Sequence, residues 1–227
     1  ARMVGLPWIQ TIGASTGMMV ALASPTASPQ PYNWARVVKH EFVHVLTLQQ
    51  THFNIPHWFT EALAVTSEGI ERPAAWNRML LDRVPRGELW SLDELTGIFV
   101  RPETPDDWQF AYCQSRLYAQ YMIETFGKET ISSMLDLYRK NVRTNAAIVQ
   151  VFDMTTDEFD AGYRDFLNRI VEEELGGSAT KAPKSIVEIE KQFNAAPDSP
   201  SKIAAFADAL FKAKRRRQAR ALAEQAL

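Results

Sequence analysis

The stretch His40-Glu41-Phe42-Val43-His44 decides which fold is predicted for this 227-residue chain. Its apolar neighbours recur at helical spacing. On a helix, residues four apart lie about 40° apart around the axis, so His40 and His44 point to the same side. Glu41 projects on that side as well, within reach of whatever the two imidazoles hold. The pattern predicts a helix that presents two nitrogen ligands and one acid to a single site.

A second helix carries the acid that completes the site. Residues 58–64 read WFTEALA, with Glu61 in the middle. Catalytic zinc takes three protein ligands and keeps one position open, and His40, His44 and Glu61 fit that ligand set. Zinc activates a water molecule and polarises a carbonyl group, and Glu41 is placed to take the water proton as general base. The sequence therefore predicts a Zn2+-dependent hydrolase site.

The surrounding sequence predicts an α+β fold that is predominantly helical. Gly13–Ala23 changes from small to apolar residues, and a strand is expected in its second half. Asn33 is the expected N-cap of the metal-binding helix. On that helix Val38, Phe42 and Val45 recur at helical spacing, so we expect their stripe to anchor the helix while the metal face points the other way.

Start and stop signals predict further helices downstream. Ser91 opens a capping-box pattern, and an aromatic and apolar helix over 110–126 ends at Gly127. Two more helices are expected at about 129–141 and 156–175.

A glycine-rich segment at 176–184 is the expected linker between two domains. Residues 1–175 form the expected catalytic domain. Residues 185–227 are expected to be helical, and their alanine-rich helix pair looks like one tetratricopeptide-type unit. Such units need neighbours to bury their faces, so we expect the natural chain to continue past Leu227 and this region to bind a protein partner.

Composition excludes some classes of partner. A net charge of -2 and a pI near 6.1 give no reason to expect nucleic acid. No run of residues approaches the roughly 20 apolar residues of a membrane span. The single cysteine, Cys113, allows no internal disulfide and is expected to be buried in a helix.

The residues around Glu61 carry a family resemblance. The chain resembles the gluzincin zinc metallopeptidases of the peptidase MA type, most closely the aminopeptidase-N-like group. Trp58, Glu61, Ala64 and Glu68 match that group's pattern around its glutamate ligand, whereas Ala62 stands where the group has glycine. The resemblance implies a zincin (thermolysin-like) catalytic domain with a small N-terminal sheet, followed by a helical hairpin. It also implies hydrolysis of peptide bonds.

The resemblance implies a catalytic tyrosine as well. In the aminopeptidase-N-like group this tyrosine begins a helical stretch that reaches a glycine 15 residues later, and Tyr112 stands at that offset from Gly127. Tyr112 is therefore the expected donor to the developing oxyanion, with Tyr118 and Tyr121 as alternatives.

One residue of the aminopeptidase-N-like group is missing. That group holds the free amino terminus of its substrate with a glutamate on a strand, and Thr16 occupies this position here. A site without this carboxylate has no evident anchor for an ammonium group. The resemblance therefore favours an endopeptidase over an aminopeptidase, with the strand after Gly17 pairing with an extended peptide substrate.

Other interpretations remain open at this point. The chain could be a catalytically inactive zincin scaffold whose C-terminal helices bind a protein partner, or it could hydrolyse a bond other than a peptide bond. His52 and His57 are expected to be structural or solvated rather than ligands. Glu68 is expected either to support a ligand or to be exposed.

Overall fold

The computed structural model describes residues 12–26, 32–174, 186–197, 199–212 and 215–224. The chain divides into two compact units, Ala1–Gly176 (unit 1) and Gly177–Leu227 (unit 2), and each is described by itself. The predicted linker at 176–184 lies outside the described residues. The elements of unit 1 are β1 (Gly13–Ser15), β2 (Val20–Leu22), α1 (Trp34–Gln50), α2 (His57–Ser67), α3 (Ala74–Arg83), a 3-10 turn (Val84–Arg86), α4 (Leu92–Val100), α5 (Pro105–Phe126), α6 (Glu129–Arg139), α7 (Thr144–Phe152), α8 (Thr156–Arg169) and a π-helical turn (Ile170–Glu174). Those of unit 2 are α9 (Ile186–Asn194), α10 (Pro200–Lys212) and α11 (Arg216–Glu224).

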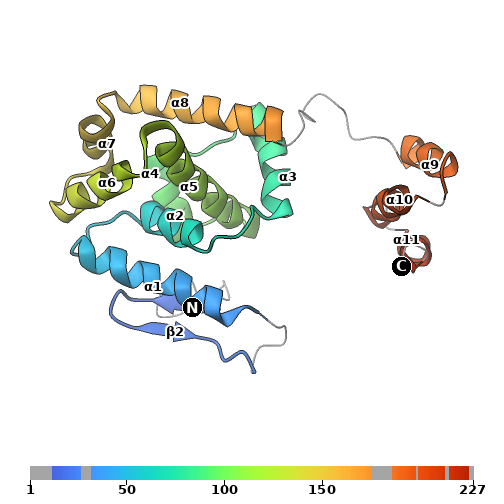
Figure 1. The fold of residues 1–227 in the computed structure, drawn as a ribbon, viewed down its shortest axis with the longest axis horizontal. Helices are drawn as coiled ribbons and strands as arrows, with labels where there is room; N and C mark the ends of the chain where they lie inside the picture. Colours follow the sequence, from blue (N-terminus) through green and yellow to red (C-terminus); the bar gives the residue numbers. More distant parts are fainter. Residues whose placement is uncertain (1–11, 27–31, 175–185, 198, 213–214, 225–227) are drawn as a thin grey trace. The chain divides into compact units, whose positions relative to one another are not determined.

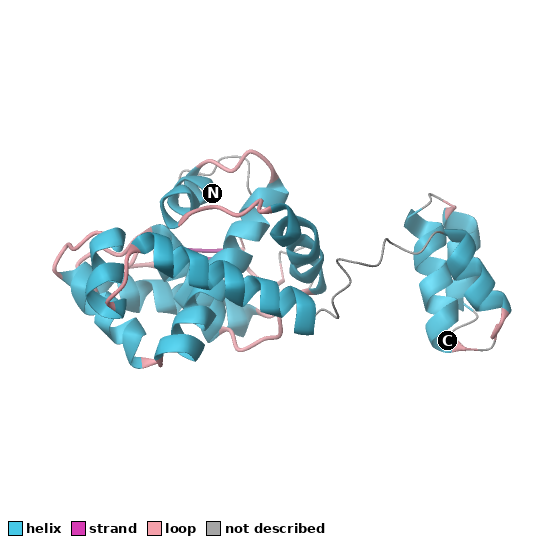
Figure 2. Ribbon diagram, turned by 90° about the horizontal axis from the view of Figure 1, so that it is seen from above, coloured by secondary structure: helices cyan, strands magenta, loops and turns pink. Residues whose placement is uncertain are grey.

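Unit 1 is built around the buried helix α2. The β1–β2 hairpin lies against α1, α1 packs on α2, and α2 packs on α5 (Figure 1). Trp58 and Phe59 of α2 are fully buried and sit in an aromatic core shared with α5, α6 and α8. Figure 2 shows how completely helices dominate the unit. The predicted fold class, predominantly helical with a small N-terminal sheet, is confirmed.

Side chains cap several helices where the sequence predicts a start. Asn33 Oδ1 accepts a hydrogen bond from Arg36 N at the start of α1. Ser91 and Glu94 form a reciprocal capping box at the start of α4. These local bonds satisfy backbone N–H groups that have no partner within the helix, so short segments can specify the starts.

The structure adds elements that the sequence prediction did not include. The segment 13–23 holds two short antiparallel strands, with Gly13 opposite Leu22 and Ser15 opposite Val20, rather than one strand in its second half. Helix α7 was not predicted, and α9 precedes the expected helix pair of unit 2. Helix α7 is short, and it is held by buried Ala147, Ile148 and Phe152. Tertiary packing rather than a strong local pattern stabilises helices of this length.

The prediction that the stripe of Val38, Phe42 and Val45 anchors α1 is wrong. Phe42 is 54% exposed, and the residues of α1 that are buried are Glu41, His44 and Thr47. The polar face packs inward because α2 offers it hydrogen-bond partners, which are described below.

No helix in the described part of the chain is long and apolar enough to cross a bilayer.

Candidate metal centre

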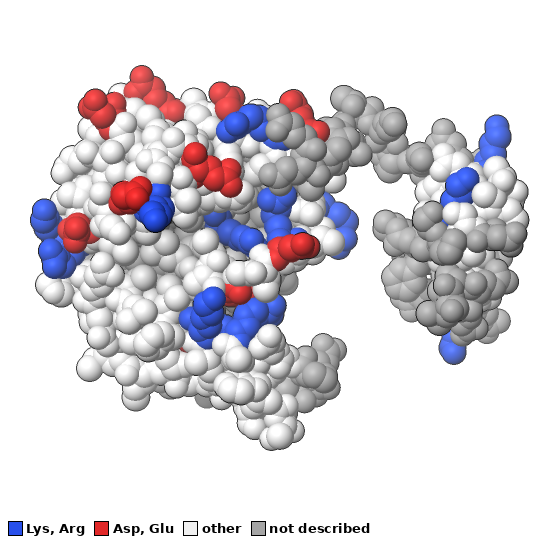
Figure 3. Space-filling model, in the orientation of Figure 1, with Lys and Arg blue, Asp and Glu red and all other residues white. Residues whose placement is uncertain are grey.

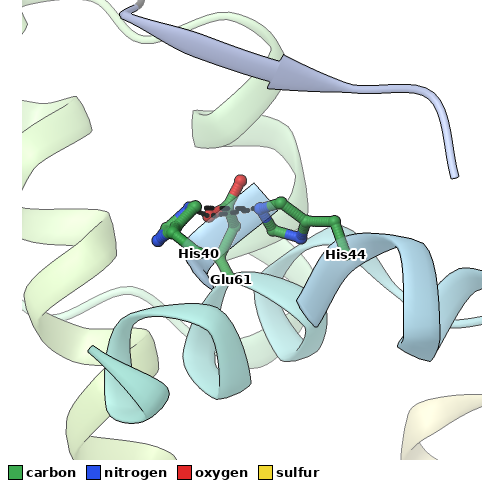
Figure 4. A group of neighbouring side chains, drawn as sticks. All are labelled: His40, His44 and Glu61. Atoms are coloured by element: carbon green, nitrogen blue, oxygen red, sulfur yellow. Dashed lines mark hydrogen bonds and ion pairs between the residues drawn. The ribbon is translucent and has the colours of Figure 1, made fainter. Parts of the chain in front are cut away.

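Two adjacent helices bring together His40, His44 and Glu61 (Figure 4). The Nε2 atoms of His40 and His44, one turn apart on α1, lie 3.1 Å from each other. Glu61 Oε2, from α2, lies 3.4 Å from the Nε2 atom of His40 and 3.5 Å from that of His44. The three atoms therefore form a nearly equilateral triangle.

The other nitrogen of His40 is held by a carboxylate. His40 Nδ1 lies 2.9 Å from Glu68 Oε1, and Glu68 Oε2 pairs with Arg36 Nε at 3.3 Å. An ionised carboxylate only accepts hydrogen bonds, so Nδ1 carries the hydrogen. Of the two expectations for Glu68, the structure shows the supporting contact to a candidate ligand.

A chain of hydroxyl groups fixes the tautomer of His44. Thr47 Oγ1 donates to the Val43 carbonyl at 2.8 Å, so it accepts from Thr60 Oγ1, also at 2.8 Å. The hydrogen of Thr60 is then used, and Thr60 Oγ1 accepts from His44 Nδ1 at 2.8 Å. The hydrogen-bond network thus assigns the hydrogen to Nδ1 and leaves the Nε2 lone pair facing the triangle.

The charges around the triangle favour a cation. Burial lowers the pKa of His40, but its contacts with the carboxylates of Glu61 and Glu68 outweigh it and raise that pKa to about 10. Burial also raises the pKa of Glu61, and the histidine contacts outweigh it and hold that pKa well below the usual range. Glu61 is therefore ionised and attracts positive charge. Without metal that charge is the second proton of His40, and a metal ion that binds at the triangle would displace this proton.

The three atoms fit a divalent metal ion such as zinc. Zinc–nitrogen and zinc–oxygen bonds of about 2.0–2.2 Å in tetrahedral geometry place neighbouring ligand atoms roughly 3.3 Å apart. The observed separations of 3.1, 3.4 and 3.5 Å bracket this value. Glu61 Oε2 is buried and has no hydrogen-bond partner among the described residues. A bound cation would satisfy this oxygen and both imidazole lone pairs at once.

Glu41 is buried beside the triangle and is left unbonded by its neighbours. Its side chain lines the same cavity, and no described residue donates a hydrogen bond to its carboxylate. Burial raises the pKa of Glu41, and the nearby His44 and His40 partly oppose this. A partly desolvated carboxylate with a raised pKa is a better proton acceptor than an ordinary surface glutamate.

A cavity of about 430 Å³ opens over these groups. The five predicted site residues, His40, Glu41, His44, Glu61 and Tyr112, all line it. Figure 4 shows a strand of the hairpin crossing above the three candidate ligands. The strand that lines the cavity is β1, through Gly13, Ala14 and Ser15. The expectation that the strand after Gly17 would border the site is therefore wrong.

Strand β1 presents backbone groups on the side away from β2. Ile12 pairs with Ala23 and Thr16 with Met19 through backbone hydrogen bonds. Because bonded pairs alternate in an antiparallel ladder, the N–H and C=O groups of Gly13 and Ser15 point to the other edge. Among the described residues no third strand pairs with this edge.

Tyr112 enters the cavity from α5. Its ring packs edge-on against Phe99 and Trp108, with centroids 5.0 and 4.9 Å away. Burial and the neighbouring carboxylates raise its pKa well above 10.0, so the hydroxyl keeps its proton. This hydroxyl makes no hydrogen bond to any described residue. The alternatives point elsewhere, since Tyr118 bonds to Asp160 and Tyr121 packs on Phe166.

The structure changes the interpretation of Thr16 and His57. Thr16 is exposed in the hairpin turn, where its Oγ1 accepts from Met19 N, and it does not line the cavity. His57 does line the cavity, and its Nε2 lies 3.1 Å from Glu61 Oε1. The i,i+4 spacing of His57 and Glu61 was the available signal for this contact.

Comparison with known proteins agrees with the geometry. Residues 23–169 match the family model described as Peptidase MA superfamily. Neither the curated proteins nor the solved structures contain a match. The matched segment covers more than half of the chain and includes α1, α2 and α5, which carry all five predicted site residues. The chain therefore belongs to the Peptidase MA superfamily.

Proposed function

We propose that this chain is a zinc-dependent metallopeptidase of the gluzincin type, with His40, His44 and Glu61 as metal ligands. The observation that carries the proposal is the triangle of His40 Nε2, His44 Nε2 and Glu61 Oε2 beside the unbonded carboxylate of Glu41. When bound, zinc lowers the pKa of a water ligand to about 7 and polarises the scissile carbonyl.

The chain's own residues then supply proton transfer and charge stabilisation. Glu41 accepts the proton of the attacking water and delivers it to the leaving amine. The hydroxyl of Tyr112 is protonated and free to donate to the oxyanion that develops on the carbonyl. The outer edge of β1 hydrogen-bonds the peptide backbone as an added strand.

We propose internal cleavage rather than removal of single amino-terminal residues. Thr16, the residue in the place of an ammonium-binding glutamate, is exposed and turned into the hairpin. The substrate is a peptide or protein and not nucleic acid, which agrees with the net charge of -2. On the face shown in Figure 3, both signs of charge are scattered over unit 1, with acidic side chains gathered along α8.

Unit 2 is proposed to bind a protein partner in the manner of tetratricopeptide-like helices. Phe206, Leu210 and Ala219 form a small core of its own, against which Ile189 and Phe193 pack. An inactive scaffold with only this function is less well supported, because Glu41 lines the cavity and none of the described residues forms a hydrogen bond with its carboxylate that would give it a structural role.

The proposal is tested with a set of end-blocked and unblocked peptides, with and without a chelator. Glu41→Gln is expected to lower kcat by about 10²- to 10⁴-fold while zinc binding is kept. Tyr112→Phe is expected to lose about 10²-fold or more, as for removal of an oxyanion donor. The control is Glu71→Gln, which changes an exposed carboxylate on the loop after α2. Activity that survives Glu41→Gln rejects the mechanism, and trimming of free amino ends alone rejects internal cleavage.

A further inference from the structure

His57 contacts a candidate metal ligand, and none of the roles assigned above uses it. It is the first residue of α2, one turn before Glu61. Its Nε2 lies 3.1 Å from Glu61 Oε1. The side chain is 38% exposed and lies on the cavity wall, with its ring centroid 5.0 Å from that of Phe99 and the two planes 30° apart.

The two oxygens of Glu61 have different surroundings. Oε2 faces the Nε2 atoms of both candidate histidine ligands, whereas Oε1 faces His57. An ionised carboxylate only accepts, so His57 Nε2 carries the hydrogen and donates it to Oε1. No other described residue donates to Oε1. Rotation of a carboxylate about its last bond has a broad energy profile, so without this donor nothing selects which oxygen faces the histidines.

We propose that His57 is a positioning residue that holds Glu61 Oε1 and thereby presents Oε2 alone to the metal. This inference rests on the metal centre proposed above. His57 acts through Glu61, and no contact of its own with the metal or with the reacting atoms is required.

The place of His57 in the fold suits this role. Side chains of a helix lean toward its N-terminus, so Glu61 reaches back toward residue 57 on the same face. Phe99 of α4 supports the His57 ring, and the same Phe99 packs edge-on against Tyr112. Because His57 is partly exposed and lies at the start of the helix, replacing it leaves the buried core of α2 intact.

The test compares zinc affinity and the visible spectrum of bound Co²⁺ in the full chain. His57→Phe keeps the ring against Phe99 and removes the donor. His57→Gln keeps an N–H group at a similar reach. His52→Asn is the control, since His52 is exposed at φ 52, a conformation that asparagine tolerates. Circular dichroism of the metal-free variants checks that each retains its helices, and His57→Leu is a second donor-free variant if His57→Phe does not fold.

We expect the donor-free variant to raise the Kd for zinc by about 10- to 100-fold, as for other groups that orient metal ligands. Its Co²⁺ spectrum should change as well, because the carboxylate is then free to bind through either or both oxygens. His57→Gln should stay close to the wild type in both measurements, and His52→Asn should match it.

Two results would overturn the inference. One is a donor-free variant with the wild-type Kd and Co²⁺ spectrum. The other is His57→Gln being as impaired as His57→Phe, which would assign the effect to the ring and not to its hydrogen bond. Failure of the wild-type chain to bind zinc would reject the metal centre itself, so failure of the two proposals can be told apart without a peptidase assay.

Discussion

Thr60 decides which nitrogen of His44 can bind a metal. Its hydroxyl accepts from His44 Nδ1 because its own hydrogen is committed to Thr47. Thr60 therefore orients His44 in the same way as Glu68 orients His40. One contact links α1 to α2 and the other links α1 to Glu68, the C-cap of α2, so the candidate ligands are oriented by the same packing that brings them together.

We predict that Thr60→Val weakens zinc binding by about 10- to 100-fold, because His44 Nδ1 loses its acceptor. The measurement is zinc titration of the metal-free chain against a chromophoric chelator. Thr66→Val is a matched control on the same helix, since Thr66 Oγ1 is buried and has no hydrogen-bond partner among the described residues. An equal loss of affinity in both variants would show that the hydroxyl chain is not what orients His44.

At the scale of elements, the close approach of β1 to α1 shapes the site. A Cβ atom added at Gly13 would lie 2.6 Å from Glu41 Oε1 and 2.7 Å from Val37 Cγ1. Only glycine lets the strand pass this close to the carboxylate of Glu41. The absence of a side chain at Gly13 thus sets the distance between the outer edge of β1, the proposed site of substrate pairing, and the triangle of candidate ligands.

We predict that Gly13→Ala lowers kcat/KM by about 10²-fold, because the strand must shift away from Glu41 and a shift of about 1 Å misplaces the substrate. The zinc Kd should change little, since the atoms nearest to the added Cβ belong to Glu41 and Val37, neither of which is a candidate ligand. Steady-state kinetics and zinc titration together check this. Gly97→Ala on α4, where nothing lies within 4 Å, should leave activity unchanged. Retained activity in Gly13→Ala would mean that β1 does not bind the substrate backbone.

The capping box of α4 makes the stability of the fold depend on pH. At the start of α4, the backbone N–H and hydroxyl of Ser91 both donate to Glu94 and lower the pKa of its carboxyl below the ordinary value of 4.5. A lowered pKa in the folded state stabilises the fold above the unfolded-state pKa, and this stability is lost as pH falls through the lower, folded-state value.

We therefore expect Glu94→Gln to lower the free energy of unfolding by roughly 0.5 kcal/mol at neutral pH, a small effect because the group is solvent-screened. The difference from the wild type should shrink toward zero as the pH is lowered below about 4.5. Urea unfolding at several pH values measures it. Glu71→Gln makes the same change of charge without a cap, and a pH-dependent difference of equal size there would point to net charge rather than to the capping box.

At the scale of the whole molecule, the candidate metal centre places a buried charge, the carboxylate of Glu61, within the helical core of unit 1. Glu61 is 6% exposed and lies between Thr60 and Ala62, which are also buried. An ionised carboxylate in such surroundings is costly unless it is paired. The histidine contacts offset this cost in part, and a cation in the triangle would offset more of it. We therefore expect metal binding at this site to stabilise unit 1.

We predict that zinc at about 100 times its Kd stabilises unit 1 by roughly 2.7 kcal/mol, or some 5 to 10 °C in Tm. All 6 tryptophans precede residue 109, so their fluorescence reports on unit 1 without unit 2. Thermal melts with zinc and with a chelator provide the comparison. Glu61→Gln, which removes the buried charge, should abolish the dependence on zinc. A Tm that does not respond to zinc in the wild type would contradict the coupling.

Local patterns predicted much of the fold and of the candidate site. The capped starts of α1 and α4 were predicted because each depends on bonds within four residues. His40 and His44 were paired because helix geometry fixes the direction of residues four apart. Local patterns did not predict the exposure of Phe42, the position of Thr16 in the hairpin turn or the presence of α7. Each of these depends on which surface another element covers.

The sequence by itself determined the capped starts of α1 and α4, the two histidines on one face and the position of Glu41 beside them, because backbone geometry relates residues within a single element. Only the tertiary structure decided that the polar face of α1 is the buried one and that β1 rather than β2 borders the cavity. It also decided that His57 faces the second oxygen of Glu61. These features depend on distances between elements, which packing sets and which no spacing along the chain encodes.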